Sequence, residues 1–175
     1  MDSSEFREFL RSRSSVREFT PDPVPEDRIR WLLTCASTAP SAGNLEAWDV
    51  VAVTDPEVRE ALAEAALSQP HVAAAPLVLV VCANYVRSMS RYGERGILYA
   101  VEDATIACTY LMLSAHAAGL ASCWTGAFDE GEVEKILDLP PHVRPIALLA
   151  VGRGRGAAER TGRMPAEDHL HTDEW

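Results

Sequence analysis

One long apolar stretch, from Leu98 to Phe128, constrains the fold of this 175-residue chain more than any other feature. Its first part is rich in Ala, Leu and Met and has no Pro or Gly before Gly119, which predicts a helix of about five or six turns. Apolar residues occupy almost every face of that helix, so we expect it to be buried. Gly119 marks the expected helix end, and residues 121–125 favour a short strand or an extended loop.

The length and composition of the chain favour one domain spanning residues 1–175 with a sizeable core, since 47% of the residues are hydrophobic. A net charge of −10 argues against non-specific binding of nucleic acid, which requires a basic surface. The four cysteines form no CxxC pair, which favours free buried thiols in a reducing cytoplasm and predicts no metal site. The N-terminus lacks the apolar segment of a signal peptide. Glu102, Asp103 and His116 favour a core helix over a membrane span.

The remaining pattern alternates helices with short apolar strands. Helices are expected at 5–13, 25–40, 55–68, 98–118 and 129–140, strands at 48–54, 76–83, 121–125 and 145–151, and a loop or short helix at 84–96. This order predicts a mixed α/β layer architecture with one sheet. The glycine-rich run at 152–156 follows the last strand and opens no helix, so it does not fit a dinucleotide-binding fingerprint.

Two polar segments are candidates for ligand binding. Residues 11–17 hold three arginines and three serines, which fits either a solvated turn or an anion site built from guanidinium, hydroxyl and backbone N–H donors. Residues 39–48 form a loop of small residues, which fits either a plain connector or a backbone lying flat against a planar ligand.

Four motifs in order resemble the nitroreductase family of FMN-dependent oxidoreductases, in its short single-domain branch. They are Arg-Ser-Ser-Val-Arg-Glu-Phe at 13–19, Ala-Pro-Ser-Ala-Gly-Asn at 39–44, Gly-Leu-Ala-Ser-Cys-Trp-Thr-Gly-Ala-Phe at 119–128 and Arg-Thr-Gly-Arg-Met-Pro at 160–165. The resemblance implies an α+β fold with a central mixed sheet flanked by helices. It also implies a homodimer with the long central helix at the interface and two FMN sites between the subunits.

The resemblance also implies a role for individual residues. Arg13, Ser14 and Ser15 would meet the phosphate and ribityl chain, Arg17 the pyrimidine edge, and Arg160 and Arg163 the phosphate again. Pro40, Ser41, Ala42 and Asn44 would contact the flavin, the first three from the partner subunit, with Gln69 near the ring carbonyls. Thr125, Gly126 and Ala127 would follow the other ring edge, with a backbone N–H directed at flavin N5. No side chain is expected to be catalytic, because the cofactor carries the chemistry.

The chain departs from the family pattern at three points. Ser14 stands where a second Arg or His is common, and Glu46–Ala47 replaces Gln-Pro. Thr161 stands where a basic residue is common, and the neighbouring Arg160 would take over its role. Glu46 either faces solvent or points inward, where it would disfavour an anionic reduced ring.

The leading hypothesis is a cytoplasmic enzyme in which NADPH or NADH reduces FMN and a nitroaromatic or quinone reoxidises it, in ping-pong order. The alternatives are a flavoenzyme with a specialised dehydrogenase or reductase substrate, and a flavin-binding protein without turnover. Tyr85, Met89 and Tyr92 are either substrate-lining residues or locally packed surface residues. His116, His169 and His171 are not assigned a catalytic role.

Overall fold

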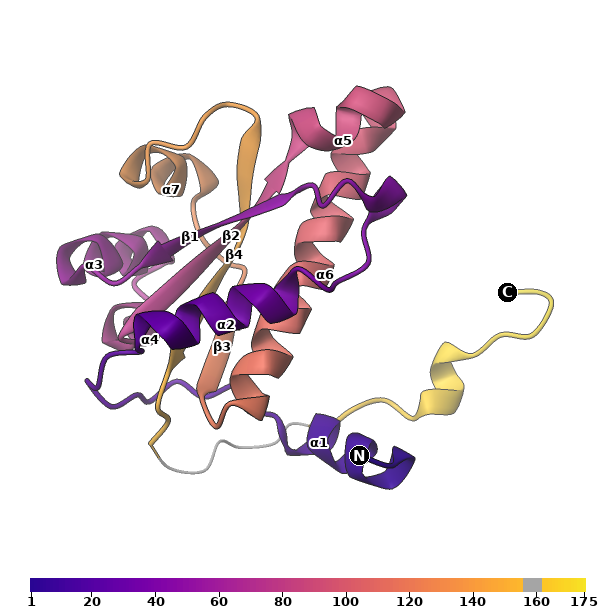
Figure 1. Ribbon diagram of the computed structural model, residues 1–175, viewed down its shortest axis with the longest axis horizontal. Helices are drawn as coiled ribbons and strands as arrows, with labels where there is room; N and C mark the ends of the chain where they lie inside the picture. The colour runs from indigo at the N-terminus through magenta and orange to yellow at the C-terminus, as the bar shows by residue number, and fades with distance from the viewer. Residues whose placement is uncertain (156–161) are drawn as a thin grey trace.

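The computed structural model describes residues 1–155 and 162–175 and contains one four-stranded sheet between two layers of helices (Figure 1). The strands are β1 (Trp48–Val53), β2 (Leu77–Asn84), β3 (Ala121–Thr125) and β4 (Val143–Gly152), in the order β1-β2-β4-β3. The helices are α1 (Ser3–Ser12), α2 (Glu26–Ala36), α3 (Pro56–Ala65), α4 (Pro70–Ala74), α5 (Tyr85–Tyr92), α6 (Gly96–Ala117) and α7 (Glu130–Ile136). Short 3-10 turns are η1 (Ala42–Asn44), η2 (Gly93–Arg95) and η3 (Ala166–His169).

All three pairings between the named strands are antiparallel, so the predicted mixed sheet is antiparallel through its four strands. Within the described residues, parallel pairing occurs only at the isolated bridge between Ser15 and Ser122. The apolar run of β2 lies at the centre of the sheet, as predicted. Because side chains alternate across a strand, its odd-numbered residues Leu77, Leu79 and Val81 face one core and its even-numbered residues the other.

Each face of the sheet is covered by its own helices. Residues of α2 and α6 pack with the odd-numbered side of β2, where Leu32, Leu111 and Leu149 are fully buried. Residues of α3, α4 and α7 pack with the other side, where Leu62 and Val133 are fully buried. Two buried faces explain why β2 and β4 are continuous apolar runs in the sequence.

The structure settles one open alternative about the helices and differs from the expectation at two others. The segment 84–96, expected as a loop or a short helix, is helical, and the side chain of Asn84 caps α5 at the backbone N–H of Arg87. The short helix α4 was not predicted. The central helix α6 is buried along one stripe only, since Ile97 and Leu98 are 41% and 52% exposed.

The four cysteines are free thiols, as expected. Burial, and then the charge of Asp49, raises the pKa of Cys82 to about 12. By length and composition the helical stretch 85–117 could also cross a membrane. Its buried residues pack on the sheet and on α2.

Candidate functional site

The segment that carries Arg13 and Arg17 runs along the edge of the sheet. The backbone N–H of Val16 donates to the carbonyl oxygen of Ser122 at 3.0 Å, next to the bridge between Ser15 and Ser122. Further on, Phe19 forms a bridge with Gly154 beyond the end of β4. The structure therefore brings the first and third sequence motifs together, although about 100 residues separate them along the chain.

A pocket of about 300 Å³ opens where these segments meet at the C-terminal end of α6. It is lined by Ser12, Arg13, Ser14, Val16, His116, Gly119, Leu120, Ala121, Ser122 and Gly154. One guanidinium, several hydroxyl groups and the backbone groups at the end of α6 thus converge on one cavity. This donor set suits a phosphate group, which guanidinium binds through charge-assisted hydrogen bonds.

His116 has a larger part in this pocket than the sequence suggested. Its Nε2 lies 2.8 Å from the Ser12 hydroxyl oxygen, and its ring packs on Phe9 with centroids 5.0 Å apart. Burial, and then the positive charge of Arg13, lowers the pKa of His116 below its usual value. The imidazole of His116 thus joins α1 to α6 through its contact with Ser12.

A buried pair lies at the other end of β3. The imidazole Nε2 of His71 lies 2.7 Å from the hydroxyl oxygen of Thr125, and both residues are almost fully buried. Burial, and then the positive charge of Arg17, lowers the pKa of His71. Arg17 and Arg13 also oppose the rise that burial causes in the pKa of the Cys123 thiol. Both arginines are thus close enough to β3 for their charges to act on its residues.

Gln69 reaches the segment that follows β3. Its Nε2 donates to the carbonyl oxygens of Ala66 and Ala127, at 2.9 and 3.1 Å. Gly126 and Ala127 themselves are exposed. Gln69 and His71 therefore fix the course of residues 125–127 from the side of α4 and leave their backbone open to a ligand.

The loop at 40–47 is held by a buried carboxylate that the sequence analysis did not select. Asp103 on α6 is 2% exposed and accepts from the backbone N–H of Ala42 at 2.8 Å and of Ala47 at 3.1 Å. Within the loop, the backbone N–H of Glu46 donates to the Ser41 hydroxyl at 3.0 Å. Gly43, Asn44 and Glu46 have positive φ, so the path of the loop is defined residue by residue.

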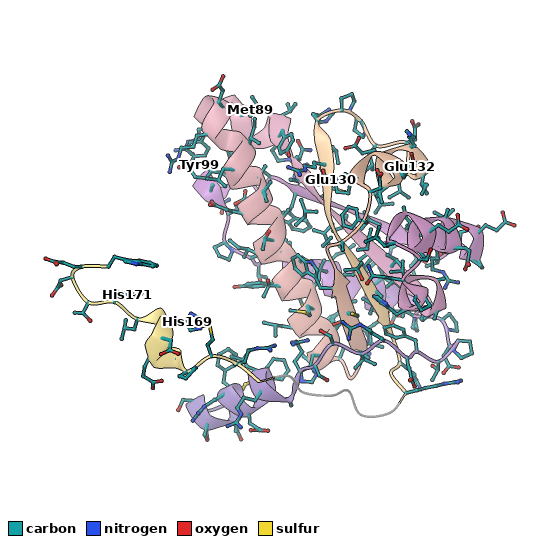
Figure 2. The ribbon with its side chains drawn as sticks, turned by 180° about the vertical axis from the view of Figure 1, so that it is seen from behind. Met89, Tyr99, Glu130, Glu132, His169 and His171 are labelled. Atoms are coloured by element: carbon teal, nitrogen blue, oxygen red, sulfur yellow. The ribbon has the colours of Figure 1, made fainter. Side chains whose placement is uncertain are left out.

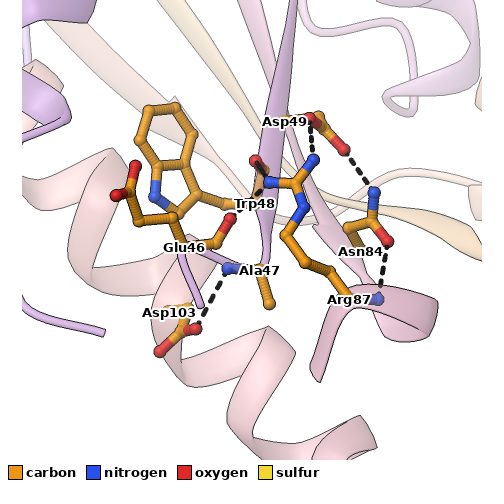
Figure 3. A network of polar contacts seen from close by, with 7 residues as sticks. All are labelled: Glu46, Ala47, Trp48, Asp49, Asn84, Arg87 and Asp103. Atoms are coloured by element: carbon orange, nitrogen blue, oxygen red, sulfur yellow. Dashed lines mark hydrogen bonds and ion pairs between the residues drawn. The ribbon is translucent and has the colours of Figure 1, made fainter. Parts of the chain in front are cut away.

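Arg87 on α5 holds the same loop from the other side (Figure 3). Its Nη1 donates to the carbonyl oxygens of Glu46 and Trp48, and its Nη2 pairs with Asp49 at 2.9 Å. Asn84 completes the network by donating to Asp49 at 2.7 Å. The half-buried Glu46 joins it through its backbone; its carboxylate makes no hydrogen bond or ion pair within the described part of the chain.

The loop and the pocket lie at opposite ends of α6. Asp103 holds the loop and His116 lines the pocket, and 13 residues of one helix separate them, or about 20 Å at a rise of 1.5 Å per residue. Figure 1 shows the same arrangement, with η1 beside α5 and the segment after α1 at the far end of α6. One copy of the chain thus brings the motifs at 13–19 and 119–128 together, but not the motif at 39–44.

The three proposed substrate-lining residues divide between two places. The Tyr85 hydroxyl accepts from Arg144 at 3.3 Å, and Arg144 also pairs with Glu130 at 2.7 Å. Tyr92 instead packs against Gly43 of the loop, where a Cβ would collide with its hydroxyl. Met89 is 36% exposed on α5. Of the three, Tyr92 is the residue in contact with a predicted site loop.

The C-terminal residues lie away from the sheet. Arg160 lies outside the described residues, and Arg163 is exposed, with its Nη1 donating to the carbonyl oxygen of Gly162 at 3.2 Å. Figure 2 shows His169 and His171 on a tail that extends away from the body of the molecule. Both histidines are exposed.

Asp103, His71 and Arg87 are the residues that sequence reasoning missed. Asp103 offered a signal, because it is an acidic residue within the most apolar helix of the chain. Such a residue requires donors when it is buried. His71 and Arg87 offered none, since the partners of their side chains lie 54 and at least 38 residues away in sequence.

Comparison with known proteins supports one grouping. The sequence model described as "Nitroreductase family" matches residues 10–73 and 66–153. The chain is 34% identical over 183 residues to "NADH dehydrogenase" of Thermus thermophilus, covering 89% of each chain. It is 26% identical over 178 residues to "FMN reductase (NADPH)" of Bacillus subtilis, covering 94% of this chain and 72% of the relative. The structure of NfrA2 from B. megaterium superposes with a TM-score of 0.91 at 26% identity, covering 100% of this chain and 76% of that one.

Proposed function

The chain belongs to the nitroreductase family, and from this premise we propose that it transfers hydride from NADPH or NADH, through bound FMN, to a small acceptor such as a nitroaromatic or a quinone. The observation that carries the proposal is the meeting of two distant motifs at the pocket near the end of α6, where Arg13, serine hydroxyls and backbone groups converge. FMN, when bound, supplies the flavin N5 atom that accepts and passes on the hydride.

The residues present fit the phosphate end of FMN. Its phosphate carries close to two negative charges, and Arg13 and Ser14 line the pocket with donors of matching chemistry. We propose that Ser15 contributes to the same end and that Arg163, together with Arg160, closes over it. In this role the arginines bind and orient the cofactor and take no part in proton transfer.

The residues around the end of β3 fit the ring end. Gly126 and Ala127 are exposed beyond the buried Thr125, and Gln69 and His71 hold this segment in place. A backbone N–H there can donate to a ring nitrogen without exchanging a proton. The permanent charge of Arg17 would stabilise negative charge on the pyrimidine side. We propose these roles for Thr125, Gly126, Ala127, Gln69 and Arg17, and none of them requires a catalytic side chain.

We propose a homodimer with two FMN sites between the subunits. The loop at 40–44 lies about 20 Å along α6 from the pocket of its own chain, so a second copy would have to bring Pro40, Ser41 and Ala42 to the flavin. Asn44, expected from the same chain, lies in the same loop and would come from the second copy as well. Exposed apolar residues on α6, among them Ile97 and Leu98, supply surface for the contact. The tail at 162–175, with Leu170 and Trp175 exposed, extends away from its own sheet and would pack on the partner (Figure 1).

We further propose that residues 1–175 form a single FMN-binding domain of a cytoplasmic protein. One sheet and the helices on its two faces account for most of the buried residues, which supports one folding unit. The four free thiols, three of them buried, support this proposal, because free thiols are typical of a protein kept in a reducing compartment.

The visible absorption spectrum of the purified protein, followed by anaerobic addition of NADPH or NADH, tests this function. We expect a flavin spectrum that bleaches quickly and returns on adding a nitroaromatic or quinone. Steady-state rates at several acceptor concentrations should give parallel double-reciprocal lines, since both substrates would use one site in turn. A flavin spectrum that persists with both nicotinamides would point to a different substrate or to a protein without turnover. Failure to bind FMN would refute the proposed cofactor site.

A further inference from the structure

Two arginines and two tyrosines form a cluster at the junction of α5 and α6. We call Arg91, Tyr92, Arg95 and Tyr99 the Arg/Tyr cluster. The two tyrosine rings pack edge to face with centroids 4.9 Å apart. The Arg91 guanidinium carbon lies 5.6 Å from the Tyr92 ring centroid, and that of Arg95 lies 5.4 Å from the Tyr99 ring centroid. Each cation is therefore stacked on a ring and held in a defined orientation.

Neither guanidinium is neutralised by a carboxylate. Within residues 1–155 and 162–175, Arg91 and Arg95 form no ion pair, whereas Arg30, Arg87 and Arg144 each pair with an acidic residue. Both arginines are exposed, and so is Glu94 between them. In a chain with a net charge of −10, two exposed arginines four residues apart without ion-pair partners are cations available to an anion.

Part of the hydrogen-bonding capacity of the two arginines is used to fix the cluster. Arg95 donates from Nε to the Tyr99 hydroxyl at 2.6 Å, and Arg91 donates from Nη1 to the carbonyl oxygen of Gly43 at 3.3 Å. Within the described residues, the terminal nitrogens of Arg95 and the Nη2 of Arg91 form no hydrogen bond or ion pair, so they can donate to a bound group. Forked donors of this kind suit a carboxylate or a phosphate.

The cluster is joined to the loop that is proposed to contact the flavin. Arg91 bonds to Gly43, and Tyr92 packs so closely on Gly43 that a Cβ there would displace its hydroxyl. The Gly43 backbone has φ of 60°, which also favours glycine there. Figure 2 shows Tyr99 on α6 near Met89, at the end of the helix beside α5. A small planar molecule bound at the loop would therefore have the cluster at its edge.

We propose that the Arg/Tyr cluster binds an anionic group, a carboxylate or a phosphate, carried by a substrate whose planar part lies over the flavin. The inference rests on the proposed function and adds a substrate class to it: acceptors or donors with a negative charge beside the reacting ring. The guanidinium groups of Arg91 and Arg95 contact the anion, and the rings of Tyr92 and Tyr99 hold the guanidinium groups in place. The anion has two sources, the carboxylate of an aromatic acceptor and the 2′-phosphate of NADPH.

The test compares the variant Arg91→Gln/Arg95→Gln with the wild type on matched substrate pairs. For the acceptor, the pair is 4-nitrobenzoate and 4-nitrobenzyl alcohol; for the donor, it is NADPH and NADH. We expect kcat/KM for the anionic member of one pair to fall at least tenfold relative to its neutral or less charged partner, with flavin content unchanged. A fall in kcat/KM confined to 4-nitrobenzoate shows that the acceptor carries the bound anion. A fall confined to NADPH shows that the donor carries it.

Two further variants make the result specific. Arg91→Lys/Arg95→Lys keeps both charges and should recover much of the discrimination. Arg28→Gln removes a guanidinium that stacks on Trp31 with nearly the same geometry, 5.6 Å from the ring centroid, and should leave all four rates unchanged. Equal changes with all four substrates, or no change, would overturn the inference and leave the proposed function intact.

A binding measurement separates this inference from the proposed function. Titration calorimetry with benzoate and with benzyl alcohol needs no turnover. We expect benzoate to bind the wild type at least tenfold more tightly than the alcohol, and the Gln variant to lose that difference. If the protein shows no nicotinamide-dependent turnover, the proposed function fails, and this measurement still decides the anion site. A wild type that prefers neither benzoate to benzyl alcohol nor NADPH to NADH in the same titration overturns the inference.

Discussion

The buried carboxylate of Asp103 lies 2.8 Å from the backbone nitrogen of Ala42, which joins the most apolar helix of the chain to a loop 61 residues earlier. Its second oxygen accepts from Ala47. Both carboxylate oxygens are thus used to hold backbone donors of one loop. A loop of small residues, which has few side chains of its own to pack, is fixed by its backbone.

Replacing Asp103 should weaken cofactor binding through this loop. In Asp103→Asn one amide oxygen can still accept, but the amide nitrogen faces a backbone donor, and an unsatisfied buried group costs about 1–3 kcal/mol. We expect the Kd for FMN to rise about tenfold, since 1.4 kcal/mol corresponds to that factor. Fluorescence titration with FMN measures it. The exposed neighbour Glu102→Gln is the matched control, and equal Kd values for the two variants would contradict the role given to Asp103.

Replacing Arg13 should weaken binding of the FMN phosphate group and leave binding of the rest of the cofactor unchanged. A hydrogen bond to a charged group contributes about 1.5–3 kcal/mol, so Arg13→Ala should raise the Kd for FMN about 10- to 100-fold. Riboflavin lacks the phosphate, and its affinity should stay within about twofold. Arg7→Ala, an exposed arginine on α1, should change neither. Equal losses for FMN and riboflavin would show that Arg13 acts on the fold and not on the phosphate.

A charge on the exposed side of α6 should separate the subunits. Leu98 is 52% exposed in the single chain, and Leu98→Arg would place a cation in the proposed apolar interface. Analytical ultracentrifugation should show a dimer for the wild type and a monomer for the variant, which we expect to retain less than about a tenth of its flavin because each site would need both subunits. Ala52→Arg, on an exposed position of β1, should remain dimeric and flavin-bound. A monomeric wild type with full flavin content would refute the shared sites.

His71 should make stability depend on pH in the mildly acidic range. Burial and the charge of Arg17 lower the pKa of this residue in the folded state, while in the unfolded chain it titrates near 6.5. Below pH 6.5 the unfolded state therefore binds more protons, and the free energy of unfolding falls as the pH decreases toward the lower folded-state pKa. Above pH 6.5 this contribution is constant.

Thermal unfolding between pH 8 and pH 5 tests this dependence. His71→Gln should unfold at a lower Tm than the wild type at pH 8, because the contact with Thr125 is disturbed, and should lose less Tm between pH 7 and pH 5.5. His142→Gln removes an exposed histidine and should keep the wild-type slope. Identical slopes for wild type and His71→Gln would rule out His71 as a source of the pH dependence.

The sequence alone determined the class of fold, the central strand and the segments that hold the candidate site. β2 is predictable because a continuous apolar run between turn signals is typical of a strand buried on both faces. The segments at 13–19 and 119–128 are recognisable through their resemblance to family motifs, since the arginines and serines of 11–17 by themselves fit either a solvated turn or an anion site. In each case the information lies within a few neighbouring residues.

Only the tertiary structure decided which of these segments meet. It brought Ser15 to Ser122 and kept the loop of Ala42 at the other end of α6, and it turned an apolar helix into one with a buried and an exposed side. It also shows that Asp103, His71 and Arg87 hold the segments of the candidate site, through partners that are mostly backbone groups distant in sequence. The physical reason is that a hydrogen bond between distant segments depends on where the chain has folded. A single sequence records the polar side chain but not the donor or acceptor that will satisfy it.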